Sequence, residues 1–463
     1  MPDTDEQVFI KVDGRQVDLA AAKLIRVTLE QALLLPDAFN IVLAAGLDWL
    51  KDGTFDIGKE VKLELAQGAA RKTLLTGEVT GLMPSMTADN EVQLHVRGYD
   101  KSHRLLRGRY TRSFVQSKDS DIAQRIAQEM GLGSDVTATS EVYDYVLQHN
   151  QTNLEFLQQR ASAIGYQVGV NEGSLYFAPV GDQPAGTGSQ PQELKWGDNL
   201  EEFEVSYTTP GQATEVLVRG WDPKRKEVIV GQARSSEVGP ELKDKSKGGE
   251  LVKKAFSMDA PMTVFREDVS TQSAAETLAQ SICDEMQGGF TTAEGLAGGD
   301  PNLRPGTDVQ VSGVGRFDGK YRVSSVTHTF DREGYRTSFC IEGSRRPQTP
   351  LTAPHGDSNR MPNHGFSIGI VTNNEDPLDM GRIKVKLPSL AADLESDWCR
   401  LLSPSAGPDR GFFFLPEVGD EVLVGFMGAQ PVIMGSLWNG KDAPPYQVDT
   451  AVDGGAVVQR AIR

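Results

Sequence analysis

The sequence predicts a mainly β protein with a small α/β insert. Turn-forming residues are frequent, with 48 glycines and 24 prolines among 463 residues, and this excess favours many short strands over long helices. Runs that alternate apolar and polar side chains fill most of the chain. Segments with a helical period are few, and two of them lie close together between residues 111 and 180. The length favours about three domains.

Residues 1–110 are expected to consist of strands. The runs LIRVTLEQALLL, FNIVLAA, VKLELA and EVQLHVRGY alternate apolar and polar residues and are separated by turn residues. This alternation directs one face of each strand toward a core and the other toward solvent. We therefore expect a first β-module over this range.

Residues 111–192 are expected to form a mixed α/β insert that ends in a linker. The run SKDSDIAQRIAQEMG places Ile122 and Ile126 one helical turn apart and ends at a glycine, which is typical of an amphipathic helix. The run TNLEFLQQRASAIG begins with Thr152 and Glu155, the spacing of a capping box. YQVGVNEGSLYFAPV then predicts a hairpin, and GDQPAGTGSQPQ predicts a flexible linker.

Strand patterns return over residues 193–345. A polar loop is expected at 231–250, and a helix follows with Ser273 as the first residue of a capping box. Three further strands come after this helix. Residues 346–365 are rich in proline and polar residues and predict a linker. The last strand-rich unit covers 366–440.

An internal repeat relates two strand-rich segments of the sequence, one before and one after the insert. Residues 58–98 and 306–343 carry the same order of features: a Gly-x-x-Val turn, a strand about twenty residues later, and a final apolar strand. This rhythm predicts two β-modules that flank the insert. The matched positions are Gly58, Val61, Val79, Leu94, Val96 and Gly98 in the first segment and Gly306, Val309, Val326, Phe339, Ile341 and Gly343 in the second.

Charge and cysteine content argue against several classes of protein. The formal net charge is −17, and an acidic chain repels the phosphates of nucleic acids. The basic stretch KSHRLLRGRYTR (101–112) is therefore interpreted as a solvated or partner-facing strand. Three widely spaced cysteines, Cys283, Cys340 and Cys399, favour reduced thiols in a chain made in the cytoplasm. The N-terminus lacks a secretory signal pattern, and no apolar run is long enough to span a membrane.

The sequence contains no convincing pattern of catalytic or metal-binding residues. The zinc-protease, disulfide-redox and serine-hydrolase motifs are absent, and the six histidines never lie four residues apart. SGVGRFDGKYRV precedes a strand instead of a helix, so it predicts a hairpin turn rather than a phosphate loop. NNEDPLD predicts an Asx-rich turn rather than a calcium loop. We expect no catalytic residue, no cofactor and no metal.

The last hundred residues contain four segments in a specific order: IGIVTNNEDPLDMGRIKVKLPSL, DWCRLLSPSAG, FFFLPEVGDEVLVGF and PVIMGSLWN. Their order and spacing resemble the oligosaccharide/oligonucleotide-binding (OB) domain that VgrG-type spike proteins share with phage baseplate spikes. The most specific pieces are GRIKVKLP, PEVGDEV and GSLWN. The first 345 residues resemble, with weaker letter agreement, the phage tail-hub half of the same family. Its best piece is VSGVGRFDGKYRVSSVTHTFDREGYRTSF.

This resemblance implies a hub and spike of a contractile injection system: a phage tail-like particle, a type VI secretion machine or an extracellular injection system. It implies a homotrimer whose partners are the inner tube protein, baseplate components, a PAAR-like tip protein and cargo effectors, with contact to the target membrane only by piercing. The expected domains are hub β-barrel module 1 at 1–110, the insert at 111–192, hub β-barrel module 2 at 193–345, a linker at 346–365, the OB barrel at 366–440 and the start of a spike at 441–463. Two barrel modules in each of three chains would present six similar surfaces to a hexameric tube.

The expected site is an assembly surface and not a catalytic centre. In FFFLPEVGDEVLVGF, Val422 and Val424 should fill the OB barrel, which directs the alternate residues outward. One small barrel cannot bury so many apolar groups, and exposed apolar patches mark interaction sites. The residues expected at the interface between subunits are Phe412, Phe413, Phe414, Leu423 and Met427.

Two alternatives to the interpretation as a structural spike protein stay open, and the sequence departs from the family pattern in one respect. One alternative is a spike-borne enzyme such as a cell-wall hydrolase. The other is an OB-fold binder of sugar or single-stranded nucleic acid, for which Arg382, Lys384 and Lys386 would supply a positive strand face. Relatives usually continue into a β-helical needle, so we expect the sequence to be a fragment and residues 457–463 to begin a strand.

Overall fold

The computed structural model confirms that the chain is mainly β. Contacts group the residues into two units: Met1–Arg109, Lys118–Glu141 and Gln151–Ala353 form the first, and Tyr110–Ser117, Val142–Asn150 and Pro354–Arg463 form the second. The structure describes residues 8–44, 53–67, 70–86, 92–171, 173–180, 182, 191–222, 227–236, 239–243, 247–266, 269, 271–341, 365–388, 390, 393–427, 430–460 and 462. The expected linker at 346–365 lies outside them except for Gly365.

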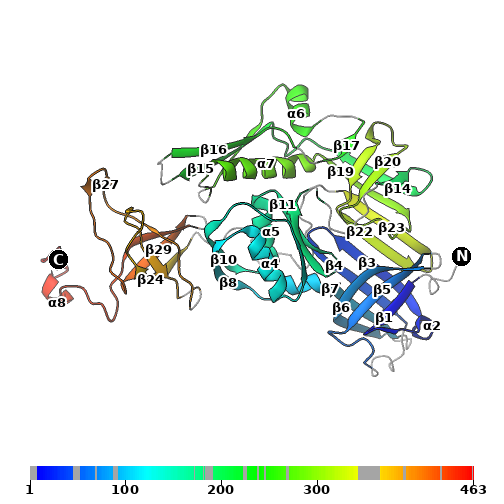
Figure 1. The fold of residues 1–463 in the computed structure, drawn as a ribbon, viewed down its shortest axis with the longest axis horizontal. Helices are drawn as coiled ribbons and strands as arrows, with labels where there is room; N and C mark the ends of the chain where they lie inside the picture. Colours follow the sequence, from blue (N-terminus) through cyan, green and yellow to red (C-terminus); the bar gives the residue numbers. More distant parts are fainter. Residues whose placement is uncertain are drawn as a thin grey trace. The chain divides into compact units, whose positions relative to one another are not determined.

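Eleven strands of the first unit join in one sheet in the described part of the chain, with the order β14-β19-β23-β22-β3-β4-β7-β6-β5-β1-β2. Figure 1 shows the early strands in blue beside the late strands in yellow, because β22 pairs with β3. The strands are β1 (Val8–Val12), β2 (Arg15–Gln16), β3 (Leu24–Ala32), β4 (Leu35–Leu43), β5 (Glu60–Gln67), β6 (Ala70–Met86), β7 (Val92–Asp100), β14 (Leu200–Tyr207), β19 (Thr291–Gly298), β22 (Ser325–Asp331) and β23 (Gly334–Ile341). The short helix α2 (Leu19–Ala22) precedes β3.

The apolar alternation in these strands builds the core of the sheet. Val27 and Leu29 of β3 are buried together with Ile41 of β4 and Val96 of β7. Phe330 of β22 belongs to the same cluster. The core therefore continues across the boundary between segments that lie 300 residues apart in sequence.

Two turns of the sheet have the same hydrogen bonds. Gly58 N–H donates to the Val79 carbonyl at 2.8 Å, and Val79 N–H donates back to the carbonyl of the residue after Gly58. Gly306 N–H donates to the Val323 carbonyl at 2.8 Å, and Val323 N–H likewise donates back to the residue after Gly306. These bonds match Val79 with Val323, so the sequence-based match of Val79 to Val326 is wrong by three residues.

Two smaller sheets of the first unit are formed by segments between residues 192 and 322. One has the order β13-β20-β21-β17 and the other β16-β15-β18, which α7 covers (Figure 1). The helix α7 begins after the N-cap Thr271, which accepts from Ala274 N–H at 3.2 Å, so Ser273 is not the cap. The elements are β13 (Gln192–Lys195), β15 (Glu215–Asp222), β16 (Glu227–Ala233), β17 (Glu241–Leu242), α6 (Gly248–Phe256), β18 (Pro261–Phe265), α7 (Gln272–Gly288), β20 (Asp308–Ser312), η2 (Gly315–Phe317) and β21 (Gly319–Arg322).

The predicted helices of the insert are present. Both bonds of the expected capping box form, from Glu155 N–H to the Thr152 hydroxyl and from Thr152 N–H to the Glu155 carboxylate. Asp119 and Arg160 join the two helices by an ion pair of 2.6 Å whose carboxylate is 1% exposed. The elements are α4 (Asp119–Glu129), β9 (Gly133–Val136), α5 (Asn153–Ala163), β11 (Tyr166–Asn171) and β12 (Ser174–Pro179), with β11 and β12 forming the expected hairpin.

The second unit contains a five-stranded sheet with the order β25-β24-β29-β30-β26. Its core includes Val371, Val385 and Val424, and Leu147 of β10 packs against it. The expected insert thus contributes strands to the same unit as the C-terminal domain. The elements are β8 (Tyr110–Ser117), β10 (Tyr143–Gln151), β24 (Phe366–Asn373), β25 (Lys384–Lys386), β26 (Arg400–Leu401), β27 (Ala406–Gly407), β28 (Arg410–Gly411), β29 (Glu421–Met427), β30 (Gln430–Ser436), α8 (Val448–Ala451), β31 (Val452–Asp453) and β32 (Ala456–Val457).

Three expectations about local structure are wrong. Residues 101–106 form the 3-10 helix η1 (Lys101–Leu106) and not a strand, because Asp100 caps the turn by accepting from Ser102 N–H. The expected loop at 231–250 contains the end of β16 and the start of α6. The expected strand from residue 457 onward ends at Val457, and residues 458–460 have no regular structure.

A pair of acidic residues lies beneath the β3–β4 turn. The Asp37 carboxylate accepts a 2.6 Å bond from Gln31. Burial raises the pKa of Asp37 to about 6, although Gln31 and the charge of Arg304 act to lower it. Burial and the neighbouring Asp37 charge raise the pKa of Asp100 well above its usual range. The folded chain therefore binds protons at this pair more tightly than the unfolded chain.

Replacing Asp37 by Asn should stabilise the first unit at neutral pH. Below the ordinary pKa of 3.8 Asp37 is protonated in both states, whereas stability is lost as the pH rises through about 6 because the folded site disfavours the charge. We expect a gain of about 1–3 kcal/mol at pH 7.5, at about 1.4 kcal/mol per pKa unit, and almost none at pH 4. Thermal unfolding at both pH values measures it, with Asp198→Asn as an exposed control. An equal gain at both pH values would contradict this explanation.

Candidate functional site: the assembly surfaces

Strand β29 has one face in the core of the C-terminal domain and one face outward. Val422 and Val424 are fully buried. Leu423 is half-buried between them, and Met427 at the end of the strand is 41% exposed. The outward residues are therefore apolar although no part of the described chain fully covers them.

The three phenylalanines lie on the segment that follows β28. Phe412, Phe413 and Phe414 are 53%, 78% and 60% exposed. The backbone of this segment is held in place, because Phe412 N–H donates to the Ser405 carbonyl at 3.0 Å and the Ser403 hydroxyl donates to the Phe412 carbonyl at 2.9 Å. The rings of Phe412 and Phe414 stack with centroids 6.2 Å apart. A fixed backbone thus presents three aromatic rings to the surroundings.

The outer face of the same sheet carries apolar residues that the sequence analysis missed. Phe366 of β24 is 67% exposed and Met434 of β30 is 40% exposed. They lie on either side of Gly425, where an added Cβ would lie 3.5 Å from Phe366 and 3.4 Å from Met434. The run FSIGIV gave a usable signal, because it places apolar residues on both faces of a strand.

The five expected interface residues thus lie in two places, three on the 412–414 segment and two on β29. Four are exposed and Leu423 is half-buried. Large exposed apolar groups that gather on one domain are typical of interaction sites. Their assignment to an interface between subunits stays a prediction.

The turn after β24 is organised by one buried carboxylate. Asp376 accepts from the backbone N–H groups of Leu378, Met380 and Arg382 at 2.9–3.2 Å. It also forms a two-point ion pair with the Arg382 guanidinium, with bonds of 2.6 and 3.0 Å, and its side chain is 4% exposed. The bond from Arg382 holds the pKa of Asp376 well below its usual range, despite the opposing effect of burial. The expected Asx-rich turn is therefore present.

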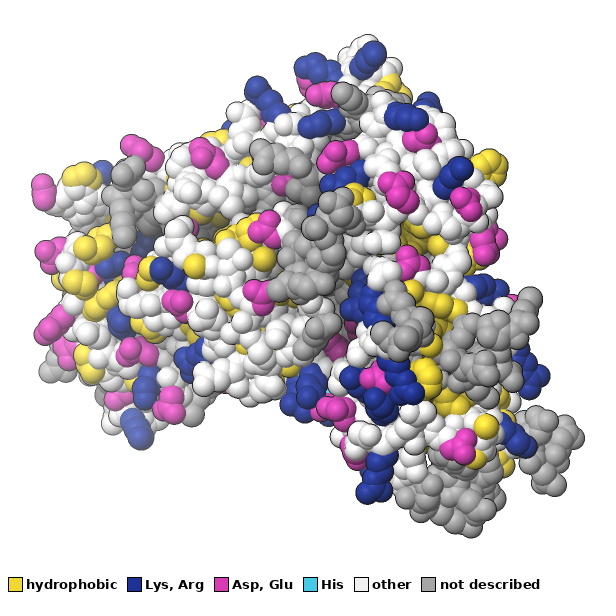
Figure 2. Space-filling model, turned by 45° about the vertical axis from the view of Figure 1, so that its right-hand side comes forward, with side chains coloured by type: hydrophobic (Ala, Val, Ile, Leu, Met, Phe, Trp, Pro, Cys, Tyr) yellow, Lys and Arg dark blue, Asp and Glu magenta, His cyan; other side chains and the backbone are white. Residues whose placement is uncertain are grey.

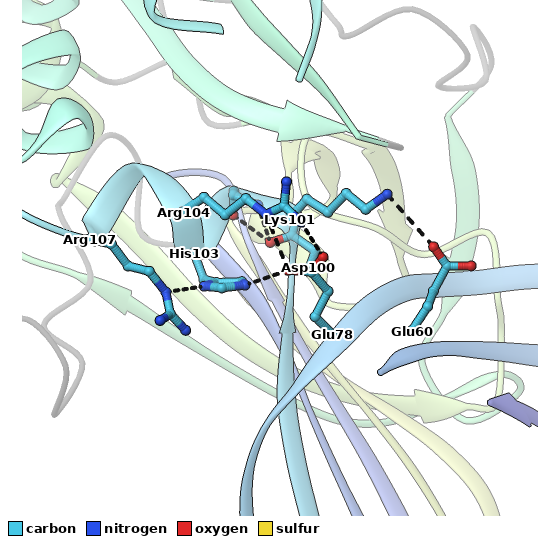
Figure 3. A network of polar contacts seen from close by, with 8 residues as sticks. Glu60, Glu78, Asp100, Lys101, His103, Arg104 and Arg107 are labelled. Carbon is cyan, nitrogen blue, oxygen red and sulfur yellow. Dashed lines mark hydrogen bonds and ion pairs between the residues drawn. The ribbon is translucent and has the colours of Figure 1, made fainter. Parts of the chain in front are cut away.

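The basic segment after β7 is neutralised within the chain. Arg104 and His103 both bond to the Glu78 carboxylate, with His103 Nε2 at 2.9 Å (Figure 3). Arg107 Nε–H donates to His103 Nδ1 at 3.0 Å, so the imidazole proton lies on Nε2 and is donated to Glu78. Burial acts to raise the pKa of Glu78, but the bonds from Arg104 and His103 outweigh it and the pKa is lowered. The side chains of His103, Arg104 and Arg107 are therefore hydrogen-bonded within the chain.

Two stretches of strand edge in the first unit have no pairing partner in the described part of the chain. β14 forms the end of the large sheet, so its side away from β19 is open. β6 pairs with β5 only up to Glu78, and beyond Val79 it pairs with β7 alone. Met83 and Met86 on this second half of β6 are 44% and 60% exposed. Open strand edges with apolar side chains are sites for pairing with another chain.

Among the described residues, no group of three or more His, Cys, Asp and Glu side chains is arranged to hold a metal ion. No helix in that part of the chain is long and apolar enough to cross a lipid bilayer.

Two family models match the chain. The model of the Alg8 N-terminal domain matches residues 45–332, which is more than half of the chain. The model of the type VI secretion system/phage-baseplate injector OB domain matches residues 367–438. The second match covers the five-stranded sheet of the second unit and its loops.

The chain is also similar to individual proteins and solved structures. The type VI secretion system spike protein VgrG1b of Pseudomonas aeruginosa is 21% identical over 369 residues, which is 73% of this chain and 48% of the relative. The E. coli c3393 protein has a TM-score of 0.57 at 15% identity and covers 92% of this chain and 99% of its own. One chain of the Francisella PdpA–VgrG complex gives a TM-score of 0.56 at 8% identity, and the match covers 96% of this chain and 79% of that chain.

The chain belongs to the Alg8 N-terminal domain family and is a VgrG-type spike protein. It spans about half of the length of the curated spike protein VgrG1b. The resemblance found in GRIKVKLP, PEVGDEV and GSLWN is thereby confirmed. The E. coli protein of similar fold is described as a component of the type VI secretion system with structural similarity to the T4 tail proteins gp27 and gp5.

The OB domain of this spike protein has little free positive charge on the face proposed for nucleic acid. Arg382 is 13% exposed and paired with Asp376. The ammonium group of Lys384 lies 5.4 Å from the Trp398 ring. On the face of the molecule in Figure 2, Lys and Arg side chains are interspersed with Asp and Glu. The OB-fold nucleic-acid reading is therefore disfavoured, because such binders need a continuous positive groove.

Replacing Asp376 by Ala should destabilise the OB domain of the spike protein by about 2–4 kcal/mol. The change leaves Arg382 unpaired and removes the acceptor of three backbone N–H groups, and broken buried ion pairs cost this much. Urea unfolding followed by tryptophan fluorescence measures the loss. The exposed neighbour Glu375→Ala is the matched control and should change stability by less than about 0.5 kcal/mol. Equal stabilities of the two variants would show that the Asp376 bonds contribute nothing.

Proposed function

We propose that the protein is the homotrimeric hub and spike of a contractile injection machine. In this role it caps the inner tube inside the baseplate and carries the membrane-piercing tip. The observation that carries the proposal is a duplication inside the first unit, which gives each chain two equivalent β-modules.

The two modules have the same strand order. The first contains β3-β4-β7-β6, and the second contains β14-β19-β23-β22 in the same sheet. The strand pairs have matching registers. In the first module Val96 of β7 lies opposite Ile41 of β4 and Leu82 of β6. In the second module Phe339 of β23 lies opposite Gly295 of β19 and Val326 of β22. Adding one constant to the residue numbers of a strand in the first module therefore gives its counterpart in the second module. The constant differs from strand to strand, but all four strands align in this way.

Irregular features recur at the matched positions. The β3–β4 pair shifts register between Leu24 and Arg26, and the β14–β19 pair shifts between Leu200 and Glu202. The turns at Gly58 and Gly306 both have positive φ angles, of 90° and 83°, and the same bonds to Val79 and Val323. Bulges are specific features of a strand pair and not of β structure in general. Their recurrence at matched positions supports an origin of the two modules by duplication of one β-module.

The packing of the modules differs by an exchange of large and small residues. In the first module an added Cβ on Gly98 would lie 2.3 Å from the Phe39 ring, so that ring covers the glycine. In the second module the Phe339 ring covers Gly295 in the same way. Each module pairs one phenylalanine with one glycine across neighbouring strands, at different positions of the shared register.

Two modules in each of three chains provide six similar surfaces, which suit a sixfold tube ring. The E. coli protein of similar fold, described as a type VI secretion component resembling tail proteins, supports a position in such a machine. One chain of the Francisella PdpA–VgrG complex has a similar fold, which supports a protein that assembles with other proteins of such a machine. We propose the inner tube protein, baseplate components, a PAAR-like tip protein and cargo effectors as partners.

The OB domain contributes the threefold contact in this proposal. Phe412, Phe413 and Phe414, together with Leu423 and Met427, meet the same surfaces of the other two chains. Burial of one exposed phenylalanine contributes about 1.5–3 kcal/mol, so three rings per chain would offset part of the cost of association. We assign the protein no catalytic role, since the relative that matches 73% of the chain is named a spike protein.

Light scattering at micromolar concentration tests both the trimer and the OB surface. We expect a particle of about three times the 50.3 kDa chain mass. Phe413→Asp should raise the concentration at which the trimer dissociates by at least about tenfold, because a charge replaces a buried ring. Phe265→Asp is the matched control, as Phe265 is 74% exposed and lies in β18. A stable monomer or dimer of the native chain, or equal effects of the two variants, would contradict the proposal.

A further inference from the structure

We propose that the side chains of Lys72 and Asn302 join in an isopeptide bond, which would link the two halves of the first unit covalently. Lys72 lies in β6 of the first module. Asn302 lies between β19 and β20, in the half of the unit that contains the second module. The two residues are 230 positions apart in the sequence. This modification goes beyond the proposed function and does not depend on the trimer.

The attacking amine and the carbonyl group are already in contact. Lys72 Nζ donates a hydrogen bond to Asn302 Oδ1. The carbon that would be attacked, Cγ, lies one C=O bond of about 1.2 Å beyond that oxygen. A lysine amine is a nucleophile toward carbonyl carbon once it has lost its proton. Both side chains are half-buried, so the ammonium group can release this proton to solvent.

A carboxylate holds the amide nitrogen that would leave. Asn302 Nδ2 donates to Asp300 Oδ1 at 3.0 Å, and the backbone N–H of Asn302 donates to the same oxygen at 2.8 Å. The amide is thereby oriented with its oxygen toward Lys72 and its nitrogen toward Asp300. A positioned carboxyl group can move a proton to a leaving nitrogen. The three side chains therefore bring the nucleophile, the electrophile and a proton carrier together.

The segment that carries Asn302 is held against both halves of the unit. The backbone N–H of Asp300 donates to the Thr337 hydroxyl of β23 at 3.0 Å. On the other side, Arg304 Nη2 donates to the Thr73 carbonyl of β6 at 2.7 Å, directly after the lysine. The two residues that flank Asn302 are buried. A fixed geometry of this kind raises the effective concentration of the reacting groups by orders of magnitude.

The shared turn of the two modules does not require this asparagine. Asn302 stands before Gly306 at the place that Thr54 occupies before Gly58. Both glycines make the same turn bonds, although a threonine has no amide group. The amide at residue 302 is therefore a feature of the second module alone, at the point where that module meets Lys72.

The reaction balances without an added reagent. The lone pair of the neutral Lys72 Nζ forms the bond to Cγ, and the C=O electrons move onto Oδ1. Asp300 takes a proton from the attacking nitrogen and passes it to Nδ2. The bond between Cγ and Nδ2 then breaks, the carbonyl forms again and one molecule of ammonia leaves. The chain thus loses the positive charge of Lys72 and gains one amide.

The bond would add a covalent connection between modules that β22 and β3 join by hydrogen bonds. Strand pairs can open locally and close again, whereas an amide bond does not. In the proposed machine the spike carries load while it pierces an envelope. A covalent connection inside the hub would keep its two modules together under that load.

Mass spectrometry of the full chain, purified folded and then denatured, tests the bond. We expect a mass lower than the sequence mass by one molecule of ammonia. A tryptic digest should contain one branched peptide with both Lys72 and Asn302, because trypsin no longer cleaves after the modified lysine. Lys72→Arg keeps the positive charge but has no primary amine, so it should have its full sequence mass. Asn302→Asp should link with loss of water and reach the mass of the linked native chain.

Asp300→Asn tests the proton carrier. Positioned acid–base groups contribute about 10²–10⁴-fold to a rate, so less than about one tenth of this variant should be linked when the native chain is fully linked. Thermal unfolding of each variant shows that it is folded. A folded native chain at its full sequence mass, or a mass loss that persists in Lys72→Arg, overturns the bond. Equal linking of Asp300→Asn overturns the role of Asp300.

Light scattering on the same samples separates this inference from the proposed function. A trimer of unlinked chains overturns the isopeptide bond and leaves the hub and spike role intact. Linked chains that stay monomeric overturn the trimer and support the bond.

Discussion

Antiparallel pairing between β22 and β3 is the interaction on which the first unit depends. It connects strands from the two ends of this half of the sequence and places Phe330 in the core built by the first hundred residues. A strand edge buried without a partner leaves backbone N–H and C=O groups unsatisfied, each at a cost of a few kcal/mol. The duplicated modules therefore stabilise each other through their edges.

The duplication also explains where the chain tolerates insertions. The hairpin between β3 and β4 turns through residues 33–34, whereas the matching connection between β14 and β19 runs through residues 208–290 and contains α6, α7 and a three-stranded sheet. Both pairs of strands nevertheless keep the same bulge and register. Loop length adds little to the free energy of closure, so the register of the sheet persists while its loops diverge.

Much of the local structure could be predicted from the sequence. Alternating runs located β3, β4, β5 and β7, and the Thr152 capping box located α5. The OB family match at residues 367–438 agrees with the resemblance found in the last hundred residues. The predicted alignment of the internal repeat was wrong. It matched Val79 with Val326, whereas the hydrogen bonds of the two turns show that Val323 is the counterpart of Val79. Letter matching cannot detect hydrogen bonds formed across a turn.

The remaining misses concern contacts between distant segments. Nothing local to Leu147 indicates that it packs on the OB core, and the exposure of Phe366 depends on which face of β24 is covered. Basic residues such as Arg104 looked available for partners, because their acid Glu78 lies 26 residues away on another strand. Open strand edges are properties of the whole sheet and carry no local signal in the sequence.

Electron microscopy of the purified assembly tests the central claim most directly. We expect class averages of a ring with threefold symmetry and six lobes of similar size, two from each chain. A ring with another symmetry, or three lobes paired with three of clearly different size, would contradict the account.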